Sequence, residues 1–405
     1  MNKTEKFIYV ILAFLATFVM VNRFLIPCVG IIGILFFLLV SKDFKLRTSK
    51  MFTFLLITAL VVIITLGLSV IPQFSQLIDL SVGIKELLRV VVYAMVLQMM
   101  AMLKMDQRFH FNVWKIITVI IVTGAILQYI KIFDMNLFLQ KIYGASKQFI
   151  YAESTDLSIF RGGSFFCNPN VFACFLVAML ANYMFTLRFT KETVLSRVFM
   201  FGLIMVGFVL SGSRTGMILG VVLIVYHLYT QSKMGLASFV KNLALIAVLL
   251  LGSLWILQVV FSVDLLGLSG LRMFKVEEGL DNSFGSKLDI FGRLIGDMNL
   301  ANMLIGYGPY DYGARMDLMV DFDLGYFITY FGLVGLVAYS VLLYGIYCWG
   351  DRMLPGRRML NMSFMIITVV FGLTAGIYFN LRMFTLYMLL FLPKLIQREE
   401  GKQLA

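Results

Sequence analysis

The segment Val198–Thr230 reads VFMFGLIMVGFVL, SGSRTG and MILGVVLIVYHLYT in succession, two apolar runs joined by a short polar turn. It is too long for one crossing of a bilayer, which needs about 20 apolar residues. Its flanks are basic, with Arg197 before it and Lys233 after it. Because Lys and Arg collect in the cytoplasmic loops of membrane proteins, we expect both flanks inside the cell. The segment therefore predicts a membrane hairpin whose turn, which contains Arg214, lies at the outer face.

The composition of the whole chain is typical of a membrane protein. Of its 405 residues, 60% are hydrophobic, and they gather in repeated long runs that indicate transmembrane helices. The formal net charge of +12 comes from Lys and Arg in short loops between these runs. The positive-inside rule accounts for that distribution, so we expect no nucleic-acid partner. Four cysteines without paired spacing predict neither a disulfide framework nor a zinc site.

Apolar runs on both sides of the hairpin predict about twelve membrane spans in total. Every loop predicted to face the cytoplasm is net basic, which places both termini there. The polar stretch 263–323 instead holds ten acidic and five basic residues, so we expect it outside. The predicted spans are two within Phe7–Val40, Met51–Ile71, Ile84–Leu103, Trp114–Phe133, Pro169–Leu187, two within Val198–Thr230, Asn242–Ser262, Leu324–Trp349, Met359–Phe379 and Met383–Pro393.

Residues 134–168 form the first predicted outer loop, and residues 263–323 form the large one. Within the large loop, Ser286–Leu304 carries apolar residues at helical spacing, with Asp289, Arg293 and Asp297 four residues apart on another face. This pattern predicts a short amphipathic helix on the membrane surface, and residues 134–149 predict a second one. The predicted fold is therefore all-α, a polytopic protein in which residues 1–405 form a single integral membrane domain.

Two arginines lie beside predicted spans, where a charge next to hydrocarbon is expensive and is usually paired or functional. Arg161 comes just before the span that starts at Pro169, and Arg214 lies at the tip of the hairpin. The planar fork of arginine fits phosphate oxygens, and the glycines beside both residues allow a ligand to approach the backbone. The alternative is that both are interfacial anchors whose side chains reach out to water.

The large loop adds further candidates of three kinds. Arg293 and Arg315 are possible phosphate ligands, although nearby carboxylates make ion pairs the alternative for both. Tyr307 and Tyr310, in the turn GYGPY, are candidates for stacking on a sugar. Both histidines of the chain fall on the predicted cytoplasmic side, so carboxylates remain the available general bases for an outer site. Asp323 is the favoured base because it lies where the loop re-enters the membrane, and a solvated loop-end charge is the alternative.

Four short motifs occur in a fixed order over residues 150–340. Together they resemble the superfamily of O-antigen polymerases (Wzy-type) and O-antigen ligases, which are polytopic membrane glycosyltransferases with a large outer loop late in the chain. The motifs are RGG…NPN at Arg161–Asn170, SGSRTG at Ser211–Gly216, GR…GYG at Gly292–Gly308 and DLGY…GLVG at Asp323–Gly335.

The resemblance implies a GT-C-like fold and glycosyl transfer at the outer face of the cytoplasmic (inner) membrane, with no metal or cofactor. The donor and the acceptor would both be oligosaccharides on undecaprenyl diphosphate, embedded in membrane lipid, and a chain-length regulator protein would be a further partner. The ligase branch carries a histidine at the position of Asp323. That departure favours a polymerase of O-antigen, capsule or exopolysaccharide and leaves the ligase to lipid A–core as the alternative.

The resemblance also implies roles for individual residues. Arg214 and Arg161, with Arg293 or Arg315, would hold the diphosphate and stabilise the charge that builds on it as it leaves. Asp323 would deprotonate the acceptor hydroxyl. The residues expected to contact sugars are Asn170, Tyr307 and Tyr310.

A lipid-linked oligosaccharide flippase or another transporter is the rival from a different functional class, because it would share the composition. Transporters place charge within their helices near the middle of the membrane and show internal repeats. In this sequence the charge lies mainly in outer loops and no strong repeat is evident, which favours an enzyme.

Overall fold

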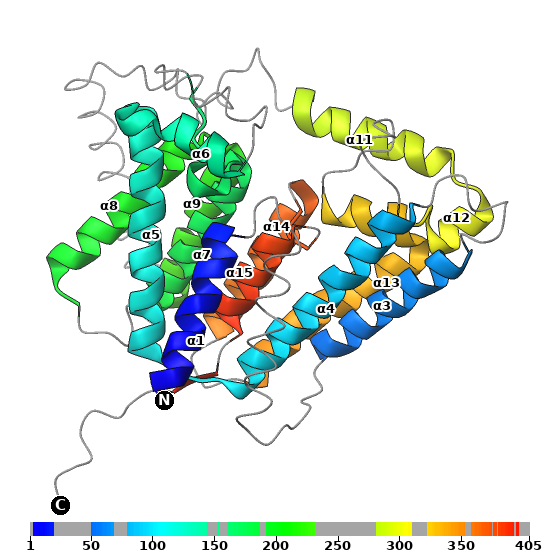
Figure 1. The fold of residues 1–405 in the computed structure, drawn as a ribbon, viewed down its shortest axis with the longest axis horizontal. Coiled ribbons are helices and arrows are strands. Elements are labelled where there is room, and N and C mark those ends of the chain that lie inside the picture. Colours follow the sequence, from blue (N-terminus) through cyan, green and yellow to red (C-terminus); the bar gives the residue numbers. More distant parts are fainter. Residues whose placement is uncertain are drawn as a thin grey trace, which may run out of the picture. The chain divides into compact units, whose positions relative to one another are not determined.

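A computed structural model of the chain describes residues 3–19, 50–68, 79–143, 153, 160–186, 192–231, 281–309, 322–352, 358–374, 376–378, 380–392 and 394–396. These residues are almost entirely helical (Figure 1), which confirms the all-α prediction for them. Among them, three helical stretches are long and apolar enough to cross a membrane, namely Gln107–Tyr129, Val194–Ser211 and Asp323–Cys348. These three helices support a helical protein embedded in a membrane, and the full set of twelve spans stays a prediction.

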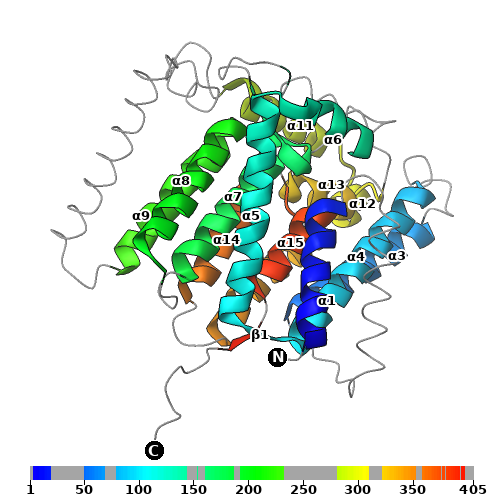
Figure 2. The same cartoon turned by 60° about the vertical axis from the view of Figure 1, so that its left-hand side comes forward.

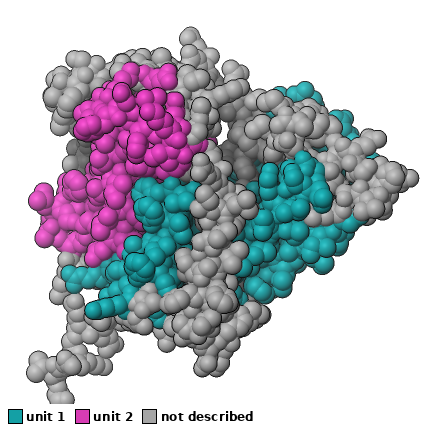
Figure 3. Space-filling model, in the orientation of Figure 1, with its two compact units in different colours: residues 1–110, 281–405 teal, residues 111–280 magenta. Residues whose placement is uncertain are grey.

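The chain divides into two compact units (Figure 3). Unit 1 consists of residues 1–110 and 281–405, and unit 2 consists of residues 111–280. The prediction of one integral membrane domain with outer loops at 134–168 and 263–323 stays a prediction.

Unit 1 holds the first helix, the last helices and the segment that follows residue 280. The helix α13 packs against α3 and α14, α3 packs against α4, and α15 packs against α4 and η1. The strands β1 and β2 pair in parallel. The described elements are α1 (Lys3–Phe14), the π-helix η1 (Leu15–Val19), α3 (Lys50–Leu68), α4 (Leu80–Met102), β1 (Lys104–Asp106), α11 (Asp281–Gly296), α12 (Leu300–Ile305), α13 (Asp323–Arg352), α14 (Arg358–Thr374), α15 (Leu381–Phe391) and β2 (Lys394–Ile396).

The helix α15 is enclosed on all sides, because every residue from Arg382 to Phe391 is buried. A helix that is apolar around its whole circumference needs such an environment. Two hydrogen bonds join it to the start of the chain. The Tyr9 hydroxyl donates to the Leu389 carbonyl oxygen at 3.1 Å, and the Arg382 guanidinium donates to the Thr17 carbonyl oxygen.

The turn after α12 is joined to α13 at a kink. Gly332, with φ +58° and ψ −144°, interrupts α13 there. The Tyr307 N–H donates to the Thr329 carbonyl oxygen at 2.7 Å, and the Gly308 N–H donates to the Tyr330 carbonyl oxygen at 3.1 Å. The kink leaves the Thr329 and Tyr330 carbonyl oxygens without partners inside α13, and the N–H groups of the turn after α12 supply those hydrogen bonds. We call this contact the α12–α13 junction.

Unit 2 is built around α7. Every residue from Val171 to Phe185 is buried, and α7 packs against both α8 and α9. The outer side of α8 exposes Val194, Leu195 and Val198, the kind of surface that a helix presents to lipid. The described elements of unit 2 are α5 (Gln107–Tyr129, of which the first turn belongs to unit 1), η2 (Ile132–Asp134), α6 (Met135–Tyr143), η4 (Ser164–Phe166), α7 (Pro169–Thr186), α8 (Val194–Ser211) and α9 (Arg214–Gln231).

The segment Val198–Thr230 forms two helices, α8 and α9, which a short turn joins and which both pack against α7 (Figure 2). The first helix ends at Ser211, and Gly212 follows with φ +57° and donates its N–H to the Val209 carbonyl oxygen. Glycine suits this left-handed cap because it has no Cβ atom to clash. The orientation of the hairpin in the membrane stays a prediction.

Some predicted helix boundaries are wrong. The span predicted to end at Phe133 ends at Tyr129, because the backbone turns left-handed at Lys131 with φ 54°. The amphipathic helix predicted over Ser286–Leu304 is two helices, α11 and α12. Asn299 separates them because its side chain accepts a hydrogen bond from the Asn302 N–H at 2.8 Å, as an N-cap does.

The span predicted over Met359–Phe379 also ends early, at Thr374. The remaining predicted helices agree in place with the described ones, including α6 within residues 134–149. The predicted span Asn242–Ser262 and the second half of Phe7–Val40 lie outside the described residues.

Candidate functional site

Arg161 lies in a segment that backbone and side-chain hydrogen bonds fix within unit 2. The Gly162 N–H donates to the Leu210 carbonyl oxygen at 2.8 Å, near the end of α8. The Ser164 hydroxyl donates to the Ile121 carbonyl oxygen of α5 at 2.6 Å. The residues directly after Arg161 are therefore anchored to α8 and α5, and the half-buried Arg161 side chain starts from a defined backbone position.

The Arg161 side chain is oriented by Asn170, because its Nη2 donates to the Asn170 Oδ1 at 3.0 Å. Asn170 lies in the first turn of α7, whose start is capped by Asn168 through hydrogen bonds from the Asn170 and Val171 N–H groups at 2.8 and 3.3 Å. The prediction that Asn170 contacts a sugar stays a prediction. Its side-chain oxygen faces Arg161, and that contact was not foreseen from the sequence.

Arg214 is the first residue of α9 and is also half-buried. The Ser213 hydroxyl accepts a hydrogen bond from the Gly216 N–H at 3.4 Å, so it sits in the N-cap position of α9. Gly216 lies directly on α7, because a Cβ atom added there would come within 2.6 Å of the Ala173 Cβ. The N-terminal turns of α7 and α9 are therefore side by side.

Arg161, Asn170 and Arg214 consequently lie at one end of unit 2, although up to 53 positions separate them in the chain. Helix N-termini carry a partial positive charge and favour anions. Two guanidinium groups beside two helix N-termini form an electropositive end that suits a phosphate or diphosphate group. We call this arrangement the arginine end of unit 2.

The remaining predicted residues that the structure describes lie in unit 1. Arg293 is exposed on α11, and its Nε donates to the Asp289 carbonyl oxygen at 3.4 Å. The Phe291 ring of α11 contacts the Phe322 ring at 5.5 Å between centroids, which places α11 beside the start of α13. Tyr307 lies in the α12–α13 junction. Arg315 and Tyr310 lie outside the described residues.

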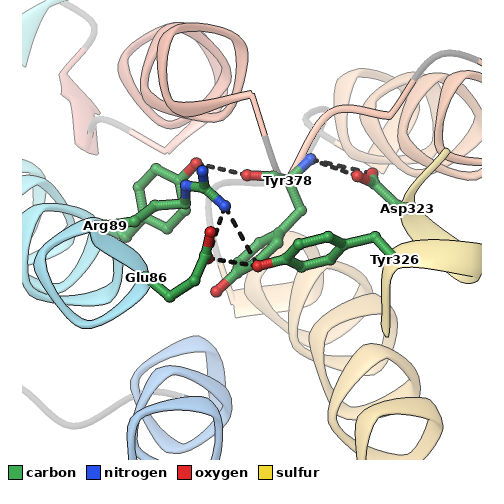
Figure 4. Close-up of polar contacts among 6 residues, drawn as sticks. Glu86, Arg89, Asp323, Tyr326 and Tyr378 are labelled. Carbon is green, nitrogen blue, oxygen red and sulfur yellow. Dashed lines mark hydrogen bonds and ion pairs between the residues drawn. The ribbon is translucent and has the colours of Figure 1, made fainter. Parts of the chain in front are cut away.

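Asp323 is the first residue of α13 and is fully buried. Its Oδ2 accepts a hydrogen bond from the Ile377 N–H at 2.7 Å, and its Oδ1 accepts one from the Tyr378 N–H at 2.9 Å (Figure 4). Both oxygens of the carboxylate therefore hold the turn between α14 and α15. These contacts favour a positioning role for Asp323, and its role as a general base stays a prediction.

A buried ion pair in α4 was not predicted from the sequence. Glu86 Oε2 accepts hydrogen bonds from Arg89 Nη1 at 2.6 Å and from the Tyr326 hydroxyl, while Arg89 Nη1 also lies 3.2 Å from the Tyr326 hydroxyl oxygen (Figure 4). The side chains of Arg89 and Glu86 are only 15% and 6% exposed. We call these three residues the Glu86 cluster. The sequence feature that points to this cluster is the presence of charged residues inside the predicted span Ile84–Leu103.

The Glu86 cluster and Asp323 belong to one polar network within unit 1. Tyr326 follows Asp323 by one turn of α13. The Tyr93 hydroxyl of α4 donates to the Tyr378 carbonyl oxygen at 2.5 Å, and the Tyr378 N–H donates to Asp323. The network therefore links α4 and α13 through the turn between α14 and α15, and Figure 4 shows how these side chains face one another.

No protein-family model and no curated protein matches this sequence. The proposed function therefore rests on the four ordered motifs and on the contacts within each unit. Within the described ranges, no group of three or more His, Cys, Asp and Glu side chains is arranged to hold a metal ion.

Proposed function

We propose that the chain is a membrane glycosyltransferase, a polysaccharide polymerase of the Wzy type. It transfers a growing glycan from undecaprenyl diphosphate to a lipid-linked repeat unit at the outer face of the cytoplasmic membrane. The observation that carries this proposal is the arginine end of unit 2, where Arg161 and Arg214 lie beside the first turns of α7 and α9. Both arginines belong to the motifs that resemble the O-antigen polymerase and ligase superfamily.

In this proposal the arginine end binds the diphosphate of the donor. Negative charge accumulates on the diphosphate as the glycosidic bond to it breaks, and guanidinium groups fixed in advance stabilise that charge. Asn170 keeps the Arg161 fork oriented through its 3.0 Å hydrogen bond. The energy of the donor bond drives the transfer, so no nucleotide is needed outside the cell.

Lysine at position 214 keeps the charge but loses the planar fork, so Arg214→Lys should reduce turnover. A hydrogen bond to a charged group is worth about 1.5–3 kcal/mol, and each 1.4 kcal/mol or so is about tenfold in rate. We therefore expect at least about a tenfold loss of polymer from a purified synthetic lipid-linked repeat, and a similar loss for Arg161→Lys. Arg197→Lys, on the exposed start of α8, is the matched control and should retain full turnover. Normal chain length and amount from Arg214→Lys would assign that arginine the anchoring role instead.

About twelve spans with both termini in the cytoplasm are part of the same proposal, and exposed side chains test it. Lys141 on α6 and Asp297 after α11 belong to the proposed outer side, whereas Arg108 at the start of α5 belongs to the inner side. In a cysteine-free background, Lys141→Cys and Asp297→Cys should react with a membrane-impermeant thiol reagent in intact cells. Arg108→Cys should react only after the cells are permeabilised. Labelling of Arg108→Cys in intact cells would reverse the orientation and remove the outer site.

A lipid-linked oligosaccharide flippase is the second candidate, and the Glu86 cluster is the observation that favours it. Because Glu86 and Arg89 lie inside α4, charged residues are not confined to the loops. Charged residues within a helix are a feature expected of a transporter. Liposomes that contain the purified protein and a lipid-linked repeat separate the two functions. A polymerase lengthens the glycan, while a flippase moves the lipid between leaflets and leaves the mass of the glycan unchanged.

A further inference from the structure

The turn that follows Arg161 contains a strained residue. Ser164 has φ +47°, in the left-handed region that residues other than glycine rarely adopt. A residue in that region persists only where its surroundings hold it there, and such residues cluster at functional sites. Ser164 is fully buried, and only Gly162 and Gly163 separate it from Arg161. Because glycine restricts the backbone least, the contacts of Ser164 help to decide where Arg161 lies.

One face of α5 holds Ser164 through three residues that are spaced three and four positions apart. The Ile121 carbonyl oxygen accepts a hydrogen bond from the Ser164 hydroxyl at 2.6 Å, and the Gln128 Oε1 accepts one from the Ser164 N–H at 2.7 Å. Gly124 lies between them, and a Cβ atom there would come within 2.8 Å of the Ser164 Oγ. This spacing places all three residues on one side of the helix. The strained turn is therefore held on α5 by a backbone carbonyl, a glycine and the side chain of Gln128.

Both ends of the Gln128 amide are used, and the side chain is buried. Because the Ser164 N–H is a donor, the amide oxygen of Gln128 must face it, and the Nε2 group must donate elsewhere. It donates to the Oδ1 of Asn136, in the first turn of α6, at 2.9 Å. Gln128 thus joins the segment that carries Arg161 to α6. A side chain in this place must accept a hydrogen bond at one end and donate one at the other, which the amide of glutamine does.

We propose that Gln128 is a positioning residue for Arg161. This inference rests on the proposed function, in which Arg161 binds the diphosphate of the donor. Gln128 holds the Ser164 N–H, the held turn fixes the backbone after Arg161, and Asn170 orients the guanidinium at 3.0 Å. A guanidinium fixed in advance stabilises the leaving diphosphate more than one that must first be ordered. All four residues belong to unit 2.

The first variant is Gln128→Met, assayed in lipid nanodiscs with a synthetic lipid-linked repeat. Methionine is similar in length and volume, but its thioether is only a weak acceptor and donates nothing. A misplacement of about 1 Å costs about a hundredfold in rate, so we expect turnover per folded molecule to fall about ten- to a hundredfold. Gln98→Met, which changes a buried glutamine of α4 in unit 1, is the matched control and should keep the wild-type turnover per folded molecule. Turnover of Gln128→Met within about twofold of the wild type would overturn the proposal.

A double-mutant cycle with Arg161→Ala separates a positioning role from a merely structural one. Alanine leaves no guanidinium to position, so Gln128→Met should cause little further loss of turnover in that background. The double variant should therefore be about as active as Arg161→Ala alone. If the two losses multiply instead, Gln128 acts independently of Arg161, and the proposal is wrong.

Gln128→Asn decides the case in which Gln128→Met does not fold. It retains a polar amide at the buried position but is shorter by one methylene, so its two ends do not reach Ser164 and Asn136 together. We expect a folded protein whose turnover falls at least about tenfold, whereas wild-type turnover would overturn the proposal. Failure of the proposed function gives a different result, because the wild type itself would then leave the lipid-linked repeat unextended.

Discussion

Gly332→Ala should unfold the α12–α13 junction and lower the free energy of unfolding by about 2–6 kcal/mol. About 1–3 kcal/mol of this comes from forcing a side chain into a backbone region that is open almost only to glycine, and about 1–3 kcal/mol from overpacking. The overpacking is severe because a Cβ atom at Gly332 would lie 2.5 Å from the Gly306 nitrogen. Thermal unfolding of the detergent-purified protein, followed by size-exclusion chromatography, measures the effect.

Gly306→Ala should have an effect of similar size, because a Cβ atom there would lie 2.3 Å from the Tyr330 carbonyl carbon. The two substitutions affect one contact, so their effects should be less than additive in the double variant. Gly292→Ala, in the helix α11, is the matched control. No atom lies within 4 Å of a Cβ atom built there, and alanine favours a helix. A wild-type melting temperature for Gly332→Ala would contradict the geometry of the junction.

Asp323→Asn should destabilise the fold by about 3 kcal/mol, since a hydrogen bond to a charged group contributes about 1.5–3 kcal/mol and one of two is replaced by a repulsive contact. The single oxygen of asparagine serves either the Ile377 or the Tyr378 N–H, and its own N–H₂ then faces the other donor. The melting temperature and the fraction of monodisperse protein in detergent measure the loss. We expect turnover per folded molecule to remain within a few-fold of the wild type.

Measuring stability and turnover together distinguishes the two possible roles of Asp323. If its carboxylate only holds the turn between α14 and α15, Asp323→Asn should lose stability and keep turnover. A stable Asp323→Asn protein without turnover would contradict the positioning role. It would assign the general base to Asp323, at the position where the ligase branch of the resembling superfamily has histidine.

The parts of the fold that the sequence predicts well are those set by local pattern. The α8–α9 hairpin follows from the length of the apolar run, its basic flanks and the glycine at position 212, all within about 35 residues. The buried helix α7 follows from the apolar run Val171–Phe185, which Asn182 alone interrupts. The break between α11 and α12 was missed, because apolar residues continue at helical spacing across Asn299. That spacing alone does not show that Asn299 caps the start of a second helix.

The parts that the sequence did not predict depend on distant partners. Glu86 and Tyr326 are 240 positions apart, and Asp323 and Tyr378 are 55 apart. A spacing rule for helices reaches only three or four residues, so it identifies Glu86 and Arg89 as neighbours and says nothing of Tyr326. The glycines at 306 and 332 were recognised as parts of motifs, but their shared contact is visible only in the folded chain. Arg161 and Arg214 were predicted to hold one diphosphate, but only the folded chain shows the contacts that bring them to one end of unit 2.

The hydrogen bonds between the two ends of unit 1 have a consequence for the timing of synthesis. Tyr9 and Thr17 are partners of Leu389 and Arg382, which are 380 and 365 positions later in the chain. A ribosome adds about 5–20 residues per second, so the first helix waits roughly 20–70 s before α15 is made. A ribosome that stalls before residue 380 therefore leaves the first helix without its hydrogen bonds to α15, whereas His110, whose Nδ1 lies 2.7 Å from the Tyr9 hydroxyl oxygen in the folded chain, is already made.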